Sequence, residues 1–281
     1  MRLRRRFIVV MLLGARVRGF VSLGVRCRAF VRSPLHAASC ARASSRPFMS
    51  RDVADVPTFS NHGEFAQHLL GLEDDPLAPP PGQLGPRIVV YRGSPEAKLM
   101  VVGEAPGAEE DKQGKPFVGR SGRMLDMILE CEGFDPARDV YVSNIVRRRP
   151  PENRTPTKEE VDFYKPFVLE ELRLVDPQVV VLAGAVAMQT LLSETRGITK
   201  VRGQWYERDG RLYMPWLHPS YLLRRPTKSK GGPKWLTWMD VKEVRRKYDE
   251  LGCPHPARAR GPRPGVLGGD RGGGKGHGDS T

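Results

Sequence analysis

The sequence of 281 residues has few cysteines and no long apolar run. Four cysteines are too few for a secreted scaffold that depends on many disulfides. No uninterrupted apolar stretch reaches the length of about 18 residues that an ordinary transmembrane helix needs. Internal repeats are also absent. Hydrophobic residues make up 39% and charged residues 28% of the chain, which is typical of a globular protein with a sizeable core.

Acidic residues are missing from residues 1–51, which contain twelve arginines. Residues 252–281 contain five basic and two acidic residues, whereas residues 52–251 contain 29 basic and 30 acidic ones. The formal net charge of +14 therefore comes from the two ends of the chain. It does not indicate whether the folded part binds nucleic acid, so that question depends on local clusters of charge.

These differences in composition divide the chain into four segments. Residues 1–51 have the composition of an organelle transit peptide, and Arg4–Arg6 with the apolar run behind them also resemble a signal peptide. We therefore expect a location in a mitochondrion or a plastid; the alternative is a disordered basic arm that binds nucleic acid. The other segments are a polar lead-in (52–86), a folded domain (87–251) and a disordered tail rich in Gly, Pro and Arg (252–281).

Within the folded segment, short apolar runs alternate with stretches of helical periodicity. Strands are expected at 88–91, 99–102, 140–146, 179–182, 201–207 and 212–217. Helices are expected at 64–72, before Gly133, after a capping box of Thr157 and Glu160, at 185–192 and at 235–251. This alternation predicts an α/β domain with a mainly parallel central sheet.

Three unusual segments lie at the carboxyl ends of predicted strands: Gly103–Gly107, Asn144–Arg149 and His218–Arg224. Ligands of open α/β sheets bind at the carboxyl ends of the strands, so we expect these segments to form one site. The glycine-rich turn can expose backbone N–H groups to an anionic oxygen, although it is also an ordinary start for a helix with acidic residues in its first turn.

Several side chains near these segments are suited to bind a nucleic acid. Phe117 lies among prolines and glycines, where it can stack on a base or simply anchor a loop. Asn144 offers donors and an acceptor in one plane, which suits a base edge. The basic residues Arg147, Arg149 and Arg154 suit phosphates, although such a charge run is more often a solvated surface. A lone histidine such as His218 is more often structural than catalytic.

Six segments in this order and spacing resemble the uracil-DNA glycosylase superfamily, specifically its family 4 type. They are GEAPGAEED (103–111), GKPFVGRSGRMLD (114–126), YVSNIV (141–146), RPPENRTPT (149–157), VVVLAG (179–184) and MPWLHPSYLLR (214–224). The resemblance covers more than half of the chain. It implies a three-layer α/β/α sandwich that flips uracil out of DNA and hydrolyses its N-glycosidic bond.

The resemblance also implies roles for single residues. Phe117 would stack on the flipped uracil, and Asn144 would read its edge and reject cytosine. His218 would stabilise the negative charge that develops on uracil O2. The backbone around Glu104 and Ala105 would line the same pocket.

Further positions complete the implied site. We expect catalytic roles for His218, Glu104 and Glu110, because Glu110 matches an acidic residue implicated in the chemistry. Asn153 would lie near the base. Expected DNA contacts are Arg147, Arg149, Arg154, Ser220 and Arg224.

The chain departs from family 4 in its cysteines, which in that family hold a [4Fe–4S] cluster. Arg148 and Tyr164 stand at the third and fourth ligand positions, and the upstream Cys-x-x-Cys pair is missing because residues 41–130 contain no cysteine. The cysteines present are Cys27, Cys40, Cys131 and Cys253. We therefore expect no metal and no cofactor, and we predict that Tyr164 fills part of the vacated volume.

The expected partner is uracil-containing DNA, single- or double-stranded, and we expect a monomer that does not bind a membrane. Breaking the glycosidic bond requires hydrogen-bond donors aimed at the oxygen that gains charge, and His218 with the turn amides could supply them. Two alternatives stay open from the sequence alone. One is a homologue without a cluster that binds nucleic acid and does not catalyse, and the other is a glycosylase for other deaminated bases.

Overall fold

A computed structural model describes residues 56–80, 82–225 and 229–254. The predicted presequence and almost all of the predicted tail lie outside the described residues. Within them, no helix is both long and apolar enough to cross a lipid bilayer.

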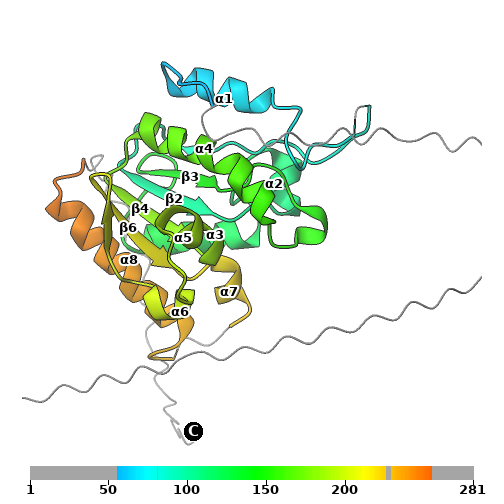
Figure 1. Cartoon of the computed structure of the whole chain (residues 1–281). Helices are drawn as coiled ribbons and strands as arrows, with labels where there is room; N and C mark the ends of the chain where they lie inside the picture. Colours follow the sequence, from blue (N-terminus) through cyan, green and yellow to red (C-terminus); the bar gives the residue numbers. More distant parts are fainter. Residues whose placement is uncertain (1–55, 81, 226–228, 255–281) are drawn as a thin grey trace, which may run out of the picture. The chain divides into compact units, whose positions relative to one another are not determined.

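Six strands of the described residues form one mixed sheet in the order β1-β3-β2-β4-β6-β5 (Figure 1). The strands are β1 (Arg92–Gly93), β2 (Leu99–Gly103), β3 (Val140–Asn144), β4 (Val179–Ala183), β5 (Tyr206–Arg208) and β6 (Arg211–Trp216). The four inner strands are parallel, and both edge strands pair antiparallel. The predicted mainly parallel sheet is therefore confirmed.

The inner strands are buried on both faces because their sequences are almost entirely apolar. All five residues of β2 and all five of β4 are buried. In the register, Leu99 pairs with Val140 on one side and with Val179 on the other. This register brings the carboxyl ends of the central strands to one edge of the sheet, where Gly103 lies beside Asn144.

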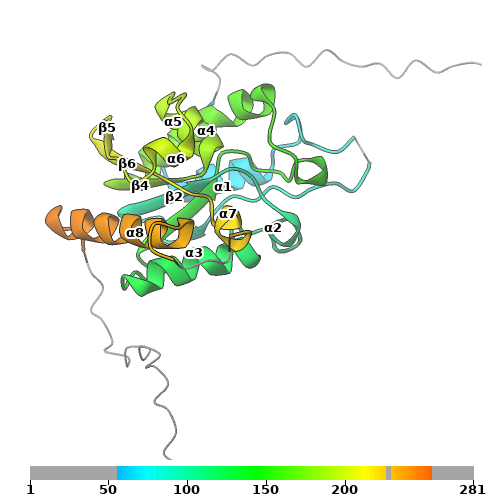
Figure 2. The same ribbon diagram turned by 90° about the horizontal axis from the view of Figure 1, so that it is seen from below.

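Helices cover both faces of the sheet, which gives three layers (Figures 1 and 2). The helices are α1 (His62–Leu70), α2 (Ala108–Gln113), α3 (Arg120–Cys131), α4 (Lys158–Val175), α5 (Ala185–Leu192), α6 (Ile198–Val201), α7 (Pro219–Leu223) and α8 (Pro233–Glu250). One hydrophobic core joins α1, α4 and α5 to one face of the sheet. A second core joins α3 and α8 to the opposite face.

Two local signals in the sequence form as expected. The Thr157 hydroxyl accepts the backbone N–H of Glu160, and the Glu160 carboxylate accepts the N–H of Thr157, so the capping box begins α4. Asp209 and Gly210 both have positive φ angles of 51° and 73°. This is the geometry that a tight hairpin between β5 and β6 requires.

Two predicted strands are only partly present. The expected strand at 88–91 is replaced by an irregular segment, and only Arg92–Gly93 pairs with β3. Its Val90 carbonyl accepts a hydrogen bond from the side chain of Arg147 at 2.9 Å, and is therefore not used in a ladder. Residues 201–207 begin as the end of α6, and only Tyr206–Arg208 is extended.

The lead-in is more ordered than its polar composition indicates. Its α1 helix buries Phe65 and Leu69 completely against the core that includes α4. The imidazole Nε2 of His62 lies 2.7 Å from the hydroxyl of Tyr141 on β3. Residues 56–80 are therefore part of the folded unit.

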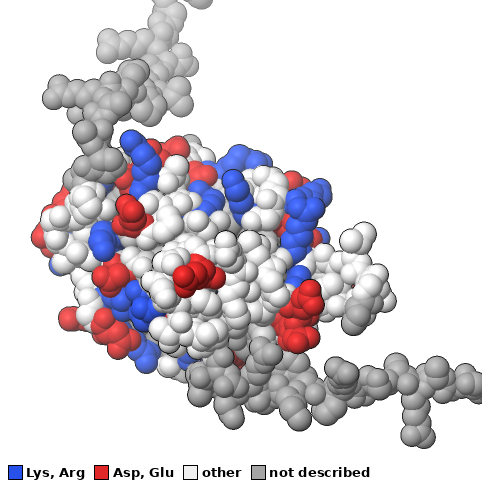
Figure 3. Space-filling view, turned by 90° about the horizontal axis from the view of Figure 1, so that it is seen from above, with Lys and Arg blue, Asp and Glu red and all other residues white. Residues whose placement is uncertain are grey.

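Charges of both signs are interspersed on the face shown in Figure 3. Basic and acidic groups surround a broad uncharged area there, and no large patch of one sign forms. This agrees with the near balance of charge that the sequence has between residues 52 and 251.

Candidate functional site

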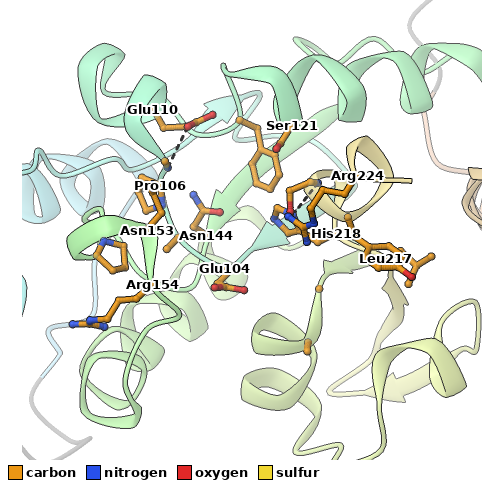
Figure 4. A pocket seen from close by; sticks show the side chains of 18 of the residues that line it. Glu104, Pro106, Glu110, Ser121, Asn144, Asn153, Arg154, Leu217, His218 and Arg224 are labelled. Carbon is orange, nitrogen blue, oxygen red and sulfur yellow. Dashed lines mark hydrogen bonds between the residues drawn. The ribbon is translucent and has the colours of Figure 1, made fainter. Parts of the chain in front are cut away.

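A cavity of about 560 Å³ opens at the carboxyl ends of β2, β3 and β6 (Figure 4). The three segments that the sequence singled out all contribute to it. Its predicted lining residues are Glu104, Ala105, Glu110, Phe117, Asn144, Asn153, Arg154, His218, Ser220 and Arg224. The three segments therefore meet at one cavity at this edge of the sheet.

The amide of Asn144 lies at the base of the cavity. Its Oδ1 is buried and has no hydrogen-bond partner among the described residues. A Cβ atom on the neighbouring Gly103 would lie 2.4 Å from this oxygen and 2.5 Å from Cζ of Phe117. Only glycine therefore fits beside these two side chains, and the buried Oδ1 of Asn144 is left without a partner among the described residues.

The ring of Phe117 forms another wall, and its backbone is unusual. Phe117 has a φ of 53°, which is rare for a residue with a side chain. Its ring centroid lies 5.8 Å from that of His218. Gly122 is required close by, since a Cβ there would lie 1.6 Å from the Phe117 carbonyl oxygen.

The carboxylate of Glu110 holds this loop in place. One oxygen accepts the N–H groups of Val118 and Gly119 at 3.0 and 2.8 Å. The other oxygen accepts the N–H of Gly107 at 3.2 Å. Both oxygens bind backbone N–H groups on either side of Phe117, so Glu110 positions this loop, and its expected catalytic role stays a prediction.

The backbone of α7 determines the orientation and protonation of His218. The N–H of Ser220 donates to Nδ1 of His218 at 3.1 Å, and the Ser220 hydroxyl lies 2.8 Å from the same nitrogen. A backbone N–H can only donate, so Nδ1 is the acceptor and the neutral ring carries its proton on Nε2. Burial, together with the nearby Arg224, lowers the pKa of His218 to about 4.

The side chain of Glu104 enters the cavity opposite His218 (Figure 4). Burial raises the pKa of its carboxyl above the ordinary value. The adjacent backbone is fixed to the segment that follows β3, because the Glu104 carbonyl accepts the N–H of Val146 at 3.0 Å. The turn therefore presents an acidic side chain from a rigid support.

Two of the four clustered arginines do not face the cavity. The side chain of Arg147 is completely buried and donates to Glu171 at 2.6 Å. Arg148 is also buried and donates to Asp75 at 2.6 Å. The expected contact of Arg147 with DNA is therefore wrong, since its guanidinium is used inside the protein.

The other two arginines remain near the surface. Nε of Arg149 donates to the side-chain oxygen of Asn153 at 2.7 Å. Arg154 forms two hydrogen bonds with the carboxylate of Glu160 and stays exposed at the rim of the cavity. Arg224 is also exposed at this rim.

The residues at the family's cluster positions do not fit an iron–sulfur cluster. Arg148 and Tyr164 are both bonded to the carboxylate of Asp75, and a guanidinium has no lone pair to offer to iron. Among the described residues, no group of three or more His, Cys, Asp and Glu side chains could hold a metal ion. Of the described cysteines, Cys131 is exposed and Cys253 is buried beside Gln178.

Sequence reasoning missed part of the cavity wall. The residues it missed include Ser121, Ile198, Thr199 and Tyr221. Ser121 and Tyr221 lie inside recognised segments and could have been proposed from their neighbours. Ile198 and Thr199 belong to α6, a helix of one turn that precedes a weak strand signal and has no marker of its own.

The chain is similar in sequence to proteins of a known family. The sequence model of the Uracil DNA glycosylase superfamily matches residues 90–242. A type-4 uracil-DNA glycosylase of Thermotoga maritima is 43% identical over 49% of this chain and 72% of its own length. One from Archaeoglobus fulgidus is 37% identical over 48% of this chain and 71% of its own length. A protein named DNA polymerase from Bacillus phage SP01 is 34% identical over 51% of this chain, but over only 16% of its own length.

The relatives contradict the expected location in a mitochondrion or a plastid. The similar glycosylases come from bacteria and archaea, which have no organelles. The interpretation of residues 1–51 as a transit peptide is not supported by these relatives either. That expectation rests on an Arg-rich composition without acidic residues and on the apolar run behind Arg4–Arg6.

Proposed function

The chain belongs to the uracil-DNA glycosylase superfamily, and on that premise we propose that it releases uracil from DNA by hydrolysing the N-glycosidic bond. The observation that carries this proposal is the unpaired, buried oxygen of Asn144 at the base of a cavity that also holds Phe117 and His218. Removing uracil in this way would begin base-excision repair.

Asn144 would select uracil through the shape of its amide. Its Oδ1 would accept the N3–H of uracil, and its amide NH₂ would donate to O4. Cytosine has no hydrogen on N3 and carries an amino group in place of O4, so both contacts would be lost. A buried polar group left unpaired costs about 1–3 kcal/mol, which makes the exclusion effective. Phe117 would support the face of the base by stacking.

His218 would stabilise the leaving base. As the bond from N1 to the sugar breaks, negative charge develops on uracil O2 and positive charge on the sugar. The Nε2–H of a neutral imidazole would donate to O2, and the anionic carboxylate of Glu104 would lie on the side of the developing cation. Donors placed in this way commonly contribute about 100- to 1000-fold in rate. Water completes the hydrolysis at C1′ of the sugar.

The rim of the cavity would bind the DNA strand. Arg149, Arg154 and Arg224 are candidates for phosphate contacts, and Ser220 would keep the loop of His218 in place. Because the target base must leave the helical stack, single-stranded or mismatched uracil would be the easier substrate.

We further propose that this enzyme works without an iron–sulfur cluster. The support is chemical, since a guanidinium and a phenol, both bonded to the carboxylate of Asp75, stand at two of the four ligand positions. No step of the reaction described above needs a metal.

The experiment uses the full chain and a single-stranded oligonucleotide that carries one uracil. Strand cleavage after alkali treatment reports release of the base. Wild type should cleave at the uracil, and His218→Ala should lower the rate about 100-fold or more while DNA binding remains. Ser193→Ala, a substitution outside the cavity, serves as the control.

Other outcomes would identify the alternatives. Binding of DNA without release of any base would support a role without catalysis. Release of hypoxanthine or xanthine in preference to uracil would indicate a glycosylase for other deaminated bases and would contradict the proposed role of Asn144.

A further inference from the structure

A buried polar cluster joins the lead-in to the loop beside the cavity. Nε of Arg148 donates to Oδ2 of Asp75 at 2.6 Å, and the Tyr164 hydroxyl donates to Oδ1 at 2.5 Å. The side chains of Asp75 and Tyr164 are completely buried. We name Asp75, Arg148 and Tyr164 the Asp75 cluster.

Arg148 extends this cluster to the backbone of the lead-in. Its two terminal nitrogens donate to the carbonyl oxygens of Pro86 at 2.5 Å and Leu72 at 2.7 Å. One guanidinium therefore bridges two places in the lead-in that lie fourteen residues apart in the sequence. Asp75 also organises its own turn, because its Oδ1 accepts the N–H of Leu77.

The loop that follows Arg148 forms one side of the cavity. Pro150, Asn153 and Arg154 all line it. The N–H groups of Asn153 and Arg154 donate to the carbonyls of Pro150 and Pro151, so the loop is a compact turn. Asn153 has a φ of 55°, which is uncommon for a residue with a side chain. The position of this turn depends on how its first residues are held.

Stability alone is a weak reason for such a cluster. Removing charges from water costs several kcal/mol per ion, and apolar residues of similar volume often stabilise a protein equally well or better. A guanidinium with fixed partners does, however, define a single position for the backbone that carries it.

We propose that the Asp75 cluster is a positioning device for the uracil reaction, and that the lead-in is consequently part of the functional enzyme. It holds the turn from Pro150 to Arg154 at the distance from His218 that the substrate requires. This inference rests on the proposed function, and it extends the functional unit to residues upstream of those that the family model matches.

The mildest test is Tyr164→Phe in the full chain, which removes one hydroxyl and keeps the volume. We expect kcat for uracil release to fall about 10-fold, because a misplacement of about 1 Å near a reacting centre can cost about 100-fold. The matched control is Tyr248→Phe, whose hydroxyl donates to the Pro254 carbonyl at the far end of α8. The control should retain the wild-type kcat.

A second variant separates positioning from stability. The triple substitution Asp75→Leu, Arg148→Met and Tyr164→Phe replaces the cluster by apolar side chains. We expect the triple variant to unfold at a urea concentration near the wild-type midpoint. Its kcat should nevertheless stay at least about 10-fold below that of wild type. If its kcat instead returns to the wild-type value together with its stability, the cluster serves stability only and the proposal is overturned.

A third measurement does not depend on activity. Amide hydrogen exchange should become faster at Asn153 and Arg154 in Tyr164→Phe, and should remain unchanged at Lys200 and Arg202 on the other side of the cavity. Unchanged exchange at 153–154 would contradict the proposal even if wild type releases no uracil. Faster exchange without wild-type activity would support the positioning role and contradict only the proposed function.

Discussion

At the scale of the residue, the chemistry of His218 depends on one backbone amide. The N–H of Ser220 occupies Nδ1 and leaves the proton of the neutral ring on Nε2. Protonation of the ring would add a hydrogen on Nδ1 that faces the N–H of Ser220, and it would put a positive charge in a buried position. Both effects favour the neutral ring. A neutral donor suits a reaction in which the leaving base becomes an anion.

This arrangement predicts the acid side of the pH profile. The pKa of His218 is lowered to about 4, so its ring stays neutral as the pH falls through the ordinary value of 6.5. Burial raises the pKa of Glu104, so its carboxylate is the first of the two groups to gain a proton. We expect kcat to decline first as the pH falls through the raised pKa of Glu104, before His218 gains a proton, as measured by single-turnover release of uracil.

Glu104→Gln provides the control for this profile. This substitution should lower kcat and remove the decline at the pKa of Glu104, so that only the loss of kcat near the pKa of His218 remains. A decline centred near pH 6.5 that persists in Glu104→Gln would show that His218 titrates normally, and would contradict the buried neutral ring.

Glu110 allows a second prediction at this scale. Glu110→Gln replaces one accepting oxygen by an NH₂ group, which cannot accept from a backbone N–H. The loop that carries Phe117 should loosen, and kcat should fall about 10-fold or more, since each buried N–H left unpaired costs about 1–3 kcal/mol. Glu109→Gln, whose carboxylate faces Lys112 at the surface, is the matched control.

If the loop that carries Phe117 stayed in place in Glu110→Gln while kcat fell, Glu110 would act directly in catalysis. Unchanged amide exchange at Val118 and Gly119 in Glu110→Gln, combined with a large loss of kcat, would contradict the positioning role. The two N–H groups that bind the carboxylate report on the loop directly.

Single residues were predictable where the backbone decides their role. Asn144 and His218 follow strands, so the topology alone brings them to the same edge of the sheet. Arg147 and Arg148 were not predictable, because their burial depends on carboxylates 24 and 73 residues away in the sequence. A run of arginines looks the same in a sequence whether its partners are phosphates or buried acids.

At the scale of the element, two internal ion pairs connect the lead-in and α4 to the segment that follows β3. The Arg148 pair lies at the Asp75 cluster, and Arg147 pairs with Glu171 on α4. The carboxylate of Glu171 also accepts hydrogen bonds from Tyr141 and Ser143 on β3. The hydroxyl of Tyr141 in turn lies beside His62 of α1, so one carboxylate connects three elements.

Removing that carboxylate should be costly. Glu171→Gln leaves the guanidinium of Arg147 buried without a countercharge, and we expect a loss of about 3–5 kcal/mol in the free energy of unfolding. Urea denaturation followed by circular dichroism would measure this loss. Glu250→Gln, which removes an exposed partner of Arg246, should change the free energy by less than about 1 kcal/mol. Equal effects of the two substitutions would contradict the role of the internal pair.

Elements with strong local signals were predicted well, and weak ones were not. The helix at 185–192 and the strand at 179–183 follow directly from apolar runs and spacing. The segment at 88–91 has the same apolar character, but its Val90 carbonyl binds the side chain of Arg147 in the loop after β3. The helix expected at 64–72 is present as α1, but its burial depends on α4 and is not indicated by the local sequence.

At the scale of the whole molecule, the large positive charge is a property of the two ends of the chain. The folded part is nearly neutral between residues 52 and 251, and Figure 3 shows mixed signs on one face. The proposed binding of DNA by the folded part would therefore depend on local basic groups, of which the exposed Arg154 and Arg224 at the cavity rim are examples. Salt dependence should accordingly be modest for the folded part, because few phosphates are neutralised.

The central claim is that a uracil-releasing site works here without a metal cluster. The most direct measurement determines iron content and uracil release on the same sample of full-length protein, purified without oxygen. We predict many turnovers per chain in a sample with far less than one iron atom per chain, and no change after treatment with a chelator. Release of uracil that rises and falls with iron content, or no release at all, would contradict the account.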